Sequence, residues 1–313
     1  MTTTSECSQE PGPRAGDRGL DDGTRLRELL ADRDARTLEY GPDGRVLQYA
    51  TYGDPDGEPL VFLHGTPGSR ILGALFDEAA RNRGVCVLAP DRPGFGGSTA
   101  WPNRRPADAS AWVEPLLVDA NASSARIVAF SGGSADALAL AGTRPGLVSR
   151  VDLVSGAPPP AIAAETPRLQ ERLGQMATHV PRLLGGALRV QRWLAERDDP
   201  ETVLEQYTDE PDAISAAIGE LVRRDFVESC HRSRNGAVTE LSWVVGDWGV
   251  RPSSVECPVR VWHGKDDENV PLADAERLCE RLPEARLTTV DGDHLTTLVH
   301  VRPCVLDANG PRD

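Results

Sequence analysis

Residues 127–135 read Ile127-Val128-Ala129-Phe130-Ser131-Gly132-Gly133-Ser134-Ala135. A β-branched apolar run meets a cluster of small residues and then an alanine-rich helical pattern, which places Ser131 at a strand-to-helix corner. A sharp turn of this kind pushes a hydroxyl oxygen clear of the backbone, and small neighbours allow the strand and helix to approach closely. The segment matches G-x-S-x-G with Ala129 in the first glycine position. It predicts a nucleophilic serine, although ordinary βα turns also contain serine beside glycine.

The segments around this corner alternate between strand and helix patterns. We expect strands at 37–40, 46–52, 59–63, 85–89, 125–130, 151–154, 259–263 and 286–290, and helices near 70–82, 106–121, 133–143, 272–281 and 295–306. Such alternation is typical of βαβ units in a parallel sheet that carries helices on both faces. The prediction is an α/β fold with a mostly parallel, eight-stranded sheet.

The strand pattern stops between about Gly156 and Val255, and amphipathic helices take its place. Two apolar stripes with helical spacing mark this region, one formed by Leu169, Leu173 and Met176 and the other by Ile214, Ile218, Leu221 and Val222. We therefore expect a sheet core over 37–156 and 256–313, interrupted by a helical cap over 157–255. Residues 1–36, rich in Gly, Pro, Asp and Arg, are predicted to form a disordered tail.

Composition limits the classes of partner. The 313 residues are 39% hydrophobic, enough for a buried core, and the net charge of -14 would be repelled by nucleic acid and by anionic membranes. No stretch is long and apolar enough to cross a bilayer, and the start of the chain lacks signal-peptide features. We expect a cytoplasmic protein with a small-molecule substrate, no nucleic-acid partner and no membrane partner; no oligomeric state is predicted.

The six cysteines indicate neither a metal site nor a disulfide framework. They stand at 7, 86, 230, 257, 279 and 304, without C-x-x-C spacing. We interpret them as free, mostly buried thiols. Neither a metal nor an organic cofactor is predicted.

Acyl transfer at a serine requires a histidine base and an acid that orients it. His294 is the preferred base because Val290-Asp291-Gly292-Asp293-His294 ends one strand and begins a helix in an acid-rich loop. The loop after the preceding strand offers three acids, of which Asp267 is the first choice and Asp266 the second. The chain order Ser131, Asp267, His294 is the order expected of an α/β-hydrolase. A solvated loop histidine is the competing interpretation of His294.

The oxyanion requires one amide beside the nucleophile and one from the loop after the third strand. Gly132 supplies the first. In His64-Gly65-Thr66-Pro67-Gly68-Ser69-Arg70 the Thr66 amide is the second candidate, because Pro67 has no N–H and moves Thr66 out of helical geometry. His64 is interpreted as a structural residue that hydrogen-bonds this loop.

These segments together resemble the α/β-hydrolase superfamily, in particular its small cytoplasmic serine hydrolases with an H-G-T-P-G-S-R oxyanion loop. Asp91-Arg92-Pro93-Gly94-Phe95-Gly96-Gly97-Ser98 is similar to the D-R-P-G-x-G-x-S segment of that family, with Asp91 and Arg92 expected to anchor a loop. Asp247-Trp248-Gly249 and the G-x-x-D-x-x-V-P pattern from Gly264 extend the resemblance over about residues 37–305. Two departures stand out: Ala129, and Ser134-Ala135-Asp136 after the nucleophile.

The resemblance implies a serine hydrolase that cleaves an ester or a related acyl bond through an acyl-enzyme. A second hypothesis keeps the same residues for C–C bond hydrolysis, thioester release, or lactonisation or cyclisation of a biosynthetic intermediate. A third is a non-catalytic ligand-binding protein on the same fold. Trp193, Trp243 and Trp248 are predicted to pack within the cap, with substrate contact as the alternative.

Overall fold

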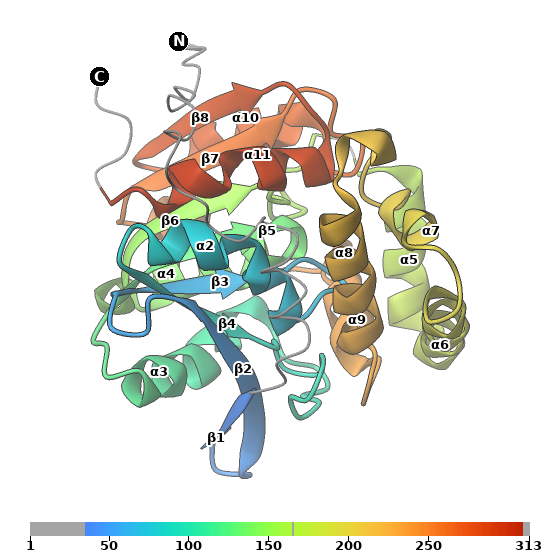
Figure 1. The fold of residues 1–313 in the computed structure, drawn as a ribbon, viewed down its shortest axis with the longest axis horizontal. Coiled ribbons are helices and arrows are strands. Elements are labelled where there is room, and N and C mark those ends of the chain that lie inside the picture. The colour runs from blue at the N-terminus through green and yellow to red at the C-terminus, as the bar shows by residue number, and fades with distance from the viewer. Residues whose placement is uncertain (1–34, 165, 309–313) are drawn as a thin grey trace, which may run out of the picture.

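The computed structural model describes residues 35–164 and 166–308 (Figure 1). The predicted disordered tail over 1–36 lies outside these residues except at its end, where Arg36 already begins the first strand.

One eight-stranded sheet forms the centre of the fold, as predicted. Its spatial order is β1-β2-β4-β3-β5-β6-β7-β8, and β2 runs antiparallel to both β1 and β4 while all other pairs are parallel. The strands are β1 (Arg36–Tyr40), β2 (Arg45–Gly53), β3 (Glu58–Leu63), β4 (Val85–Pro90), β5 (Ala125–Phe130), β6 (Val148–Val154), β7 (Val259–Gly264) and β8 (Ala285–Val290).

The sheet is covered on both faces, and neighbouring residues of one strand belong to different cores. On β3, Val61 and Leu63 join one apolar cluster, whereas Leu60 and Phe62 join another. This alternation follows from the two-residue side-chain period of a strand. Every residue of β5 is buried, which explains its nearly continuous apolar sequence at the middle of the sheet.

The helices of the core follow the predicted positions, and three of them directly follow a 3₁₀ segment; before α4 this segment is η3 (Ser131–Gly133). The expected helix at 70–82 is η1 (Arg70–Phe76) followed by α2 (Asp77–Arg81), and that at 106–121 is η2 (Pro106–Ala109) followed by α3 (Ser110–Asp119). Pro106 suits the first position of a helix because its missing N–H has no partner there. The remaining core helices are α4 (Ser134–Thr143), α10 (Leu272–Arg281) and α11 (His294–Leu306).

In the described part of the span between β6 and β7, five α-helices form a group beside the sheet, which we call the helical insertion (Figure 1). They are α5 (Arg168–His179), α6 (Pro181–Ala195), α7 (Pro200–Leu204), α8 (Ala216–Ser229) and α9 (Asn235–Ser242). Within the described residues this span contains no strand.

Of the two predicted apolar stripes, one is partly buried and the other is fully buried. Leu173 and Met176 pack against the small apolar cluster of the insertion, but Leu169 is 69% exposed because it lies at the rim of a cavity. The second stripe is buried throughout, although Ile214 precedes α8 and is not part of it.

The cysteine prediction is correct for four residues and wrong for one. Cys86, Cys230, Cys257 and Cys279 are free, whereas Cys304 on α11 is disulfide-bonded. The absence of C-x-x-C spacing gives no sign of this bond, so the sequence pattern missed it. Among the described helices, none has the length and apolar character needed to cross a membrane.

Candidate active site

Ser131 lies at the corner between β5 and α4, where the chain turns sharply. Its φ of +50° is in the left-handed region, which is uncommon for a residue other than glycine. Gly133 permits the close approach of helix and strand, since a Cβ there would lie 2.5 Å from the Leu63 carbonyl oxygen. Ala129 is fully buried within β5, and its methyl group is accommodated in the sheet. The departure from glycine at Ala129 therefore leaves the corner intact.

His294 and Asp267 form a hydrogen-bonded pair. Nδ1 of His294 lies 2.8 Å from Oδ2 and 3.0 Å from Oδ1 of Asp267, and both residues are buried. Asp267 follows β7, and its Oδ1 also accepts hydrogen bonds from the amides of Asn269 and Val270. Asp266, the second candidate acid, is exposed. With Nδ1 directed at the carboxylate, the opposite ring nitrogen, Nε2, is left for the cavity that His294 lines.

The pKa of Asp267 lies below its usual value. Burial alone would raise it, but the charge and hydrogen bond of His294 outweigh burial, and His263 and the Val270 amide add to their effect. The carboxylate is therefore held ionised next to the imidazole, which favours the Nδ1-protonated tautomer.

His294 is the first residue of α11, and Asp293 caps this helix. The Asp293 carboxylate accepts a hydrogen bond from the Thr296 amide, as in a capping box. Its other oxygen accepts hydrogen bonds from the Thr208 hydroxyl at 2.5 Å and the Asp209 amide at 2.9 Å. Since Thr208 and Asp209 follow α7, the helical insertion helps to fix the position of His294.

Thr66 and Gly132 lie against each other. A Cβ on Gly132 would come within 2.4 Å of Thr66 Oγ1 and 3.5 Å of the Thr66 amide nitrogen. His64 makes the loop contacts expected of it: Nδ1 lies 2.8 Å from the Gly65 carbonyl oxygen, and Nε2 accepts a hydrogen bond from the Arg92 amide. Burial, followed by the charge of Arg92, lowers the pKa of His64 well below its usual value, so His64 is neutral.

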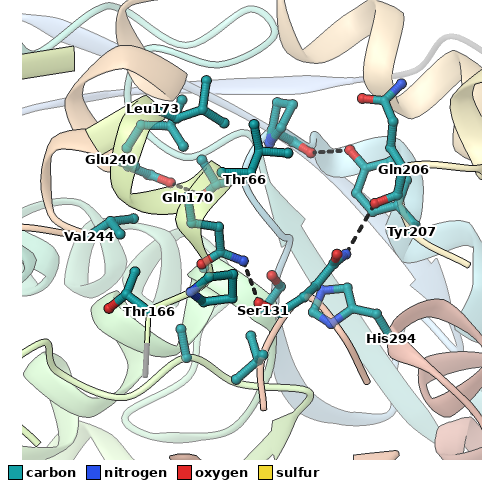
Figure 2. A pocket seen from close by; sticks show the side chains of 18 of the residues that line it. Thr66, Ser131, Thr166, Gln170, Leu173, Gln206, Tyr207, Glu240, Val244 and His294 are labelled. Carbon is teal, nitrogen blue, oxygen red and sulfur yellow. Dashed lines mark hydrogen bonds between the residues drawn. The ribbon is translucent and has the colours of Figure 1, made fainter. Parts of the chain in front are cut away.

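A cavity of about 700 Å³ joins these residues (Figure 2). Ser131, Gly132, Thr66 and His294 line it on the side of the sheet core, and the helical insertion supplies much of its apolar wall. Trp243 and Trp248 are buried and also border the cavity, so their contact with a substrate stays a prediction, whereas Trp193 is half-exposed on α6. No Lys or Arg occurs among the described lining residues.

A chain of amide groups crosses one side of the cavity (Figure 2). The Gln170 side chain on α5 donates to the Asn269 carbonyl oxygen, and the Asn269 side chain donates to the Gln206 carbonyl oxygen at 3.1 Å. The loop that carries Asp267 is thereby joined to two parts of the helical insertion.

Four fully or almost fully buried charged side chains lie next to the site, and one of them, Glu240, also lines the cavity. Arg92 and Arg104 each form ion pairs with both Asp136 and Glu240. The sequence identified Arg92 as a loop anchor and Asp136 as a departure from the family, but it missed Arg104 and Glu240. A glutamate on an amphipathic helix ordinarily faces solvent, so nothing local marks Glu240 as buried.

Asp91, the other predicted anchor, is also buried. Its carboxylate accepts hydrogen bonds from the Arg70 amide and guanidinium and from the Gly97 amide. Across the described residues 35–164 and 166–308, no group of three or more His, Cys, Asp or Glu is arranged to hold a metal ion.

Comparison with known proteins agrees with this geometry. The sequence model of the Alpha/beta hydrolase family matches residues 60–306. A pimeloyl-[acyl-carrier protein] methyl ester esterase from Aromatoleum aromaticum is 30% identical over 259 residues, covering 79% of this chain and 95% of that protein. A non-heme chloroperoxidase from Streptomyces lividans is 27% identical over 262 residues, covering 80% and 89% respectively.

Among solved structures, an enol-lactonase from Burkholderia xenovorans superposes with a TM-score of 0.65 at 18% identity, covering 86% of this chain and 96% of that one. This likeness concerns the fold, which is the α/β-hydrolase fold predicted from the sequence. Together with the family match and the esterase relative, it identifies the chain as a hydrolase and a member of the Alpha/beta hydrolase family.

Proposed function

We propose that this hydrolase cleaves an ester of a small organic molecule through an acyl-enzyme. Ser131 is the nucleophile, His294 the base and Asp267 the orienting acid; the amides of Thr66 and Gly132 form the oxyanion hole. The observation that carries the proposal is the buried Asp267–His294 pair, whose histidine lines the same cavity as Ser131. A triad of this kind is recognised by its geometry and roles.

The steps follow from this arrangement. Ser131 Oγ attacks the carbonyl carbon while His294 Nε2 takes its proton, and Asp267 stabilises the imidazolium that forms. The amides of Thr66 and Gly132 donate hydrogen bonds to the developing oxyanion. The C–O bond to the alcohol then breaks, and the alcohol leaves with the proton from His294. Water repeats the sequence on the acyl-enzyme, which releases the acid and restores Ser131.

The helical insertion, within the predicted span 157–255, is proposed to act as the cap that selects the substrate. Its helices border most of an apolar cavity large enough for a medium-sized ester. The name of the esterase relative suggests methyl esters as first substrates, and p-nitrophenyl esters serve as chromogenic probes of the same reaction. The cytoplasmic location and the absence of nucleic-acid and membrane partners remain predictions from composition.

Fluorophosphonate labelling of the wild type and of Ser131→Ala tests the nucleophile. We expect stoichiometric labelling of the wild type, abolished by the substitution, because only an activated serine reacts. A folded wild type that binds an ester in the cavity and yet resists the probe would refute the proposal.

Hydrolysis is separated from the alternatives by the product formed in oxygen-18 water. An ester hydrolysed through an acyl-enzyme gives an acid that carries one labelled oxygen, whereas lactonisation or cyclisation gives an unlabelled product. Assays with thioesters and vinylogous C–C substrates test the other two reactions of the same triad. The non-catalytic alternative is not retained, because the chain is a hydrolase by its family and its esterase relative.

A further inference from the structure

The loop that carries Thr66 is held by carboxylates from the helical insertion. On α8, Asp225 Oδ1 accepts hydrogen bonds from the Ser69 amide at 2.8 Å, the Ser69 hydroxyl at 2.7 Å and the Leu72 amide at 3.2 Å. Glu228 on the same helix pairs with Arg70 at 2.6 Å. The insertion therefore contacts this loop through ionised or hydrogen-bonded groups as well as through apolar packing.

The Thr66 side chain itself also contacts a carboxylate of the helical insertion. The Thr66 hydroxyl donates to Glu240 Oε2 on α9 at 2.5 Å, a contact drawn in Figure 2, and accepts a hydrogen bond from Arg92 Nη2 at 3.1 Å. Because Oγ1 would lie only 2.4 Å from a Cβ on Gly132, the Thr66 side chain fills the space beside that glycine. The two hydrogen bonds of the Thr66 hydroxyl and its packing against Gly132 together fix the position of the Thr66 side chain.

Arg92 joins the same loop to the helix after the nucleophile. Its Nη2 donates to the Gly65 carbonyl oxygen at 3.0 Å, and its Nη1 pairs with Asp136 Oδ2 on α4 at 3.1 Å. Arg104 completes the group by pairing with both Asp136 and Glu240. The two donors proposed for the oxyanion, Thr66 on the loop and Gly132 just before α4, are thus connected through one buried set of charges.

We propose that Glu240 and Arg92 are positioning residues for the oxyanion hole, acting on the Thr66 amide through the Thr66 hydroxyl. The inference rests on the proposed function, and it makes the helical insertion part of the catalytic geometry as well as part of the substrate cavity. Preorganised donors gain their effect from being fixed before the reaction begins, so small displacements of Thr66 are costly.

The decisive experiment compares Thr66→Val with Thr66→Ser. Valine keeps the shape and removes the hydroxyl, so the contacts to Glu240 and Arg92 are lost while the amide remains. We expect kcat to fall about 10- to 100-fold with KM changed less than about threefold, since one oxyanion donor is worth roughly 100- to 1000-fold. Affinity for a trifluoromethyl ketone, which forms a tetrahedral adduct, should fall in parallel with kcat. Thr66→Ser should recover most of the loss.

Thr143→Val is the matched control, because its hydroxyl bonds the Ala139 carbonyl oxygen at the far end of α4. It should leave kcat and ketone affinity unchanged. If Thr66→Val does not fold at the assay temperature, Glu240→Gln takes its place and should show the same loss of kcat at nearly constant KM.

The outcomes separate the two proposals. A wild type that is not labelled by fluorophosphonate overturns the proposed function. A wild type that is labelled, with Thr66→Val retaining its kcat and ketone affinity, overturns the positioning role alone. Equal losses in Thr66→Val and Thr66→Ser would also overturn it, because both variants keep the amide and only one keeps the hydroxyl.

Discussion

Arg104 and Asp136 form an ion pair in which neither side chain is exposed, with 2.8 Å between Nη1 and Oδ1. Arg104 also pairs with Glu240 of α9, and its guanidinium lies 4.6 Å from the centre of the Trp243 ring. Asp136 belongs to α4, the helix that follows the proposed nucleophile, Ser131. The contact between the sheet core and the helical insertion thus depends on charges that water does not reach.

Removing one member of this group should be far more costly than removing a surface ion pair. Arg104→Leu leaves two carboxylates short of a partner, and we expect it to lower the free energy of unfolding by ~3–5 kcal/mol. In a chain of this size, Tm should fall on the order of 10 °C. Arg144→Leu is the control: its pair with Glu114 is about half-exposed, and its loss should cost below ~1 kcal/mol. Urea denaturation of both variants measures the difference.

Asp267 and Asp266 should differ sharply in their effect on catalysis. Asp267→Asn removes the charge that holds His294 in the productive tautomer, and kcat should fall by about 10⁴-fold, as for the corresponding change in other triads. Asp266→Asn alters an exposed carboxylate next in sequence and should leave kcat within about twofold of the wild type. Steady-state kinetics on one p-nitrophenyl ester compare the two. A small effect of Asp267→Asn would remove this residue from the triad.

Asp225 should make stability depend on pH. Burial above all, with a contribution from Asp91, raises the pKa of Asp225 to about 7, while hydrogen bonds from Ser69 and Leu72 oppose the shift. Because its pKa in the unfolded chain is about 3.9, the folded state holds the extra proton between these values. The free energy of unfolding therefore falls as pH rises from about 4 to about 7, by on the order of 1 kcal/mol per pH unit from this group.

Asp225→Asn removes this titration and keeps an oxygen that accepts from Ser69. Measured by urea denaturation at pH 5, 6, 7 and 8, the stability of the variant relative to the wild type should rise up to pH 7 and then level off. Parallel curves for the two proteins would show that Asp225 ionises normally.

The charge around the cavity should select against anionic substrates. Glu205, Asp209 and Glu268 are exposed lining residues, and the described lining offers no Lys or Arg to pair with an anion. Of two p-nitrophenyl esters with acyl chains of equal length, the one that ends in a carboxylate should have a kcat/KM at least about tenfold lower than the one that ends in a methyl group.

Added salt, and substitutions that neutralise the lining carboxylates, distinguish electrostatic discrimination between the two esters from discrimination by the shape of the cavity. The ratio between the two esters should shrink at 0.5 M NaCl, where the Debye length is only several ångströms, and in a variant with Glu205→Gln, Asp209→Asn and Glu268→Gln. If the kcat/KM ratio of the two esters is the same in all three measurements, the discrimination comes from the apolar wall of the cavity and the electrostatic prediction is wrong.

Most of the fold could be predicted from the sequence because its signals are local. All eight strands of the sheet coincide with strand-like runs in the sequence. Since parallel strands present their carboxyl ends at one edge, Ser131 and His294 are expected to meet there. The resemblance to the G-x-x-D-x-x-V-P pattern, which starts at Gly264, then favours Asp267 as the first choice among the loop acids. The helical segments at 70–82 and 106–121 are confirmed in place, and each begins with a 3₁₀ segment before the α-helix.

The tertiary structure alone decided which charges are buried and what they contact. Asp267 and Asp266 are adjacent in sequence, yet only the folded loop directs one of them to His294. Glu240 lies 174 residues after Thr66, and Asp225 lies 156 residues after Ser69. The sequence determines how apolar and polar residues alternate within a segment, because that pattern follows the period of the backbone. A buried carboxylate is stable only when distant donors are brought to it, and that is a property of the assembled fold.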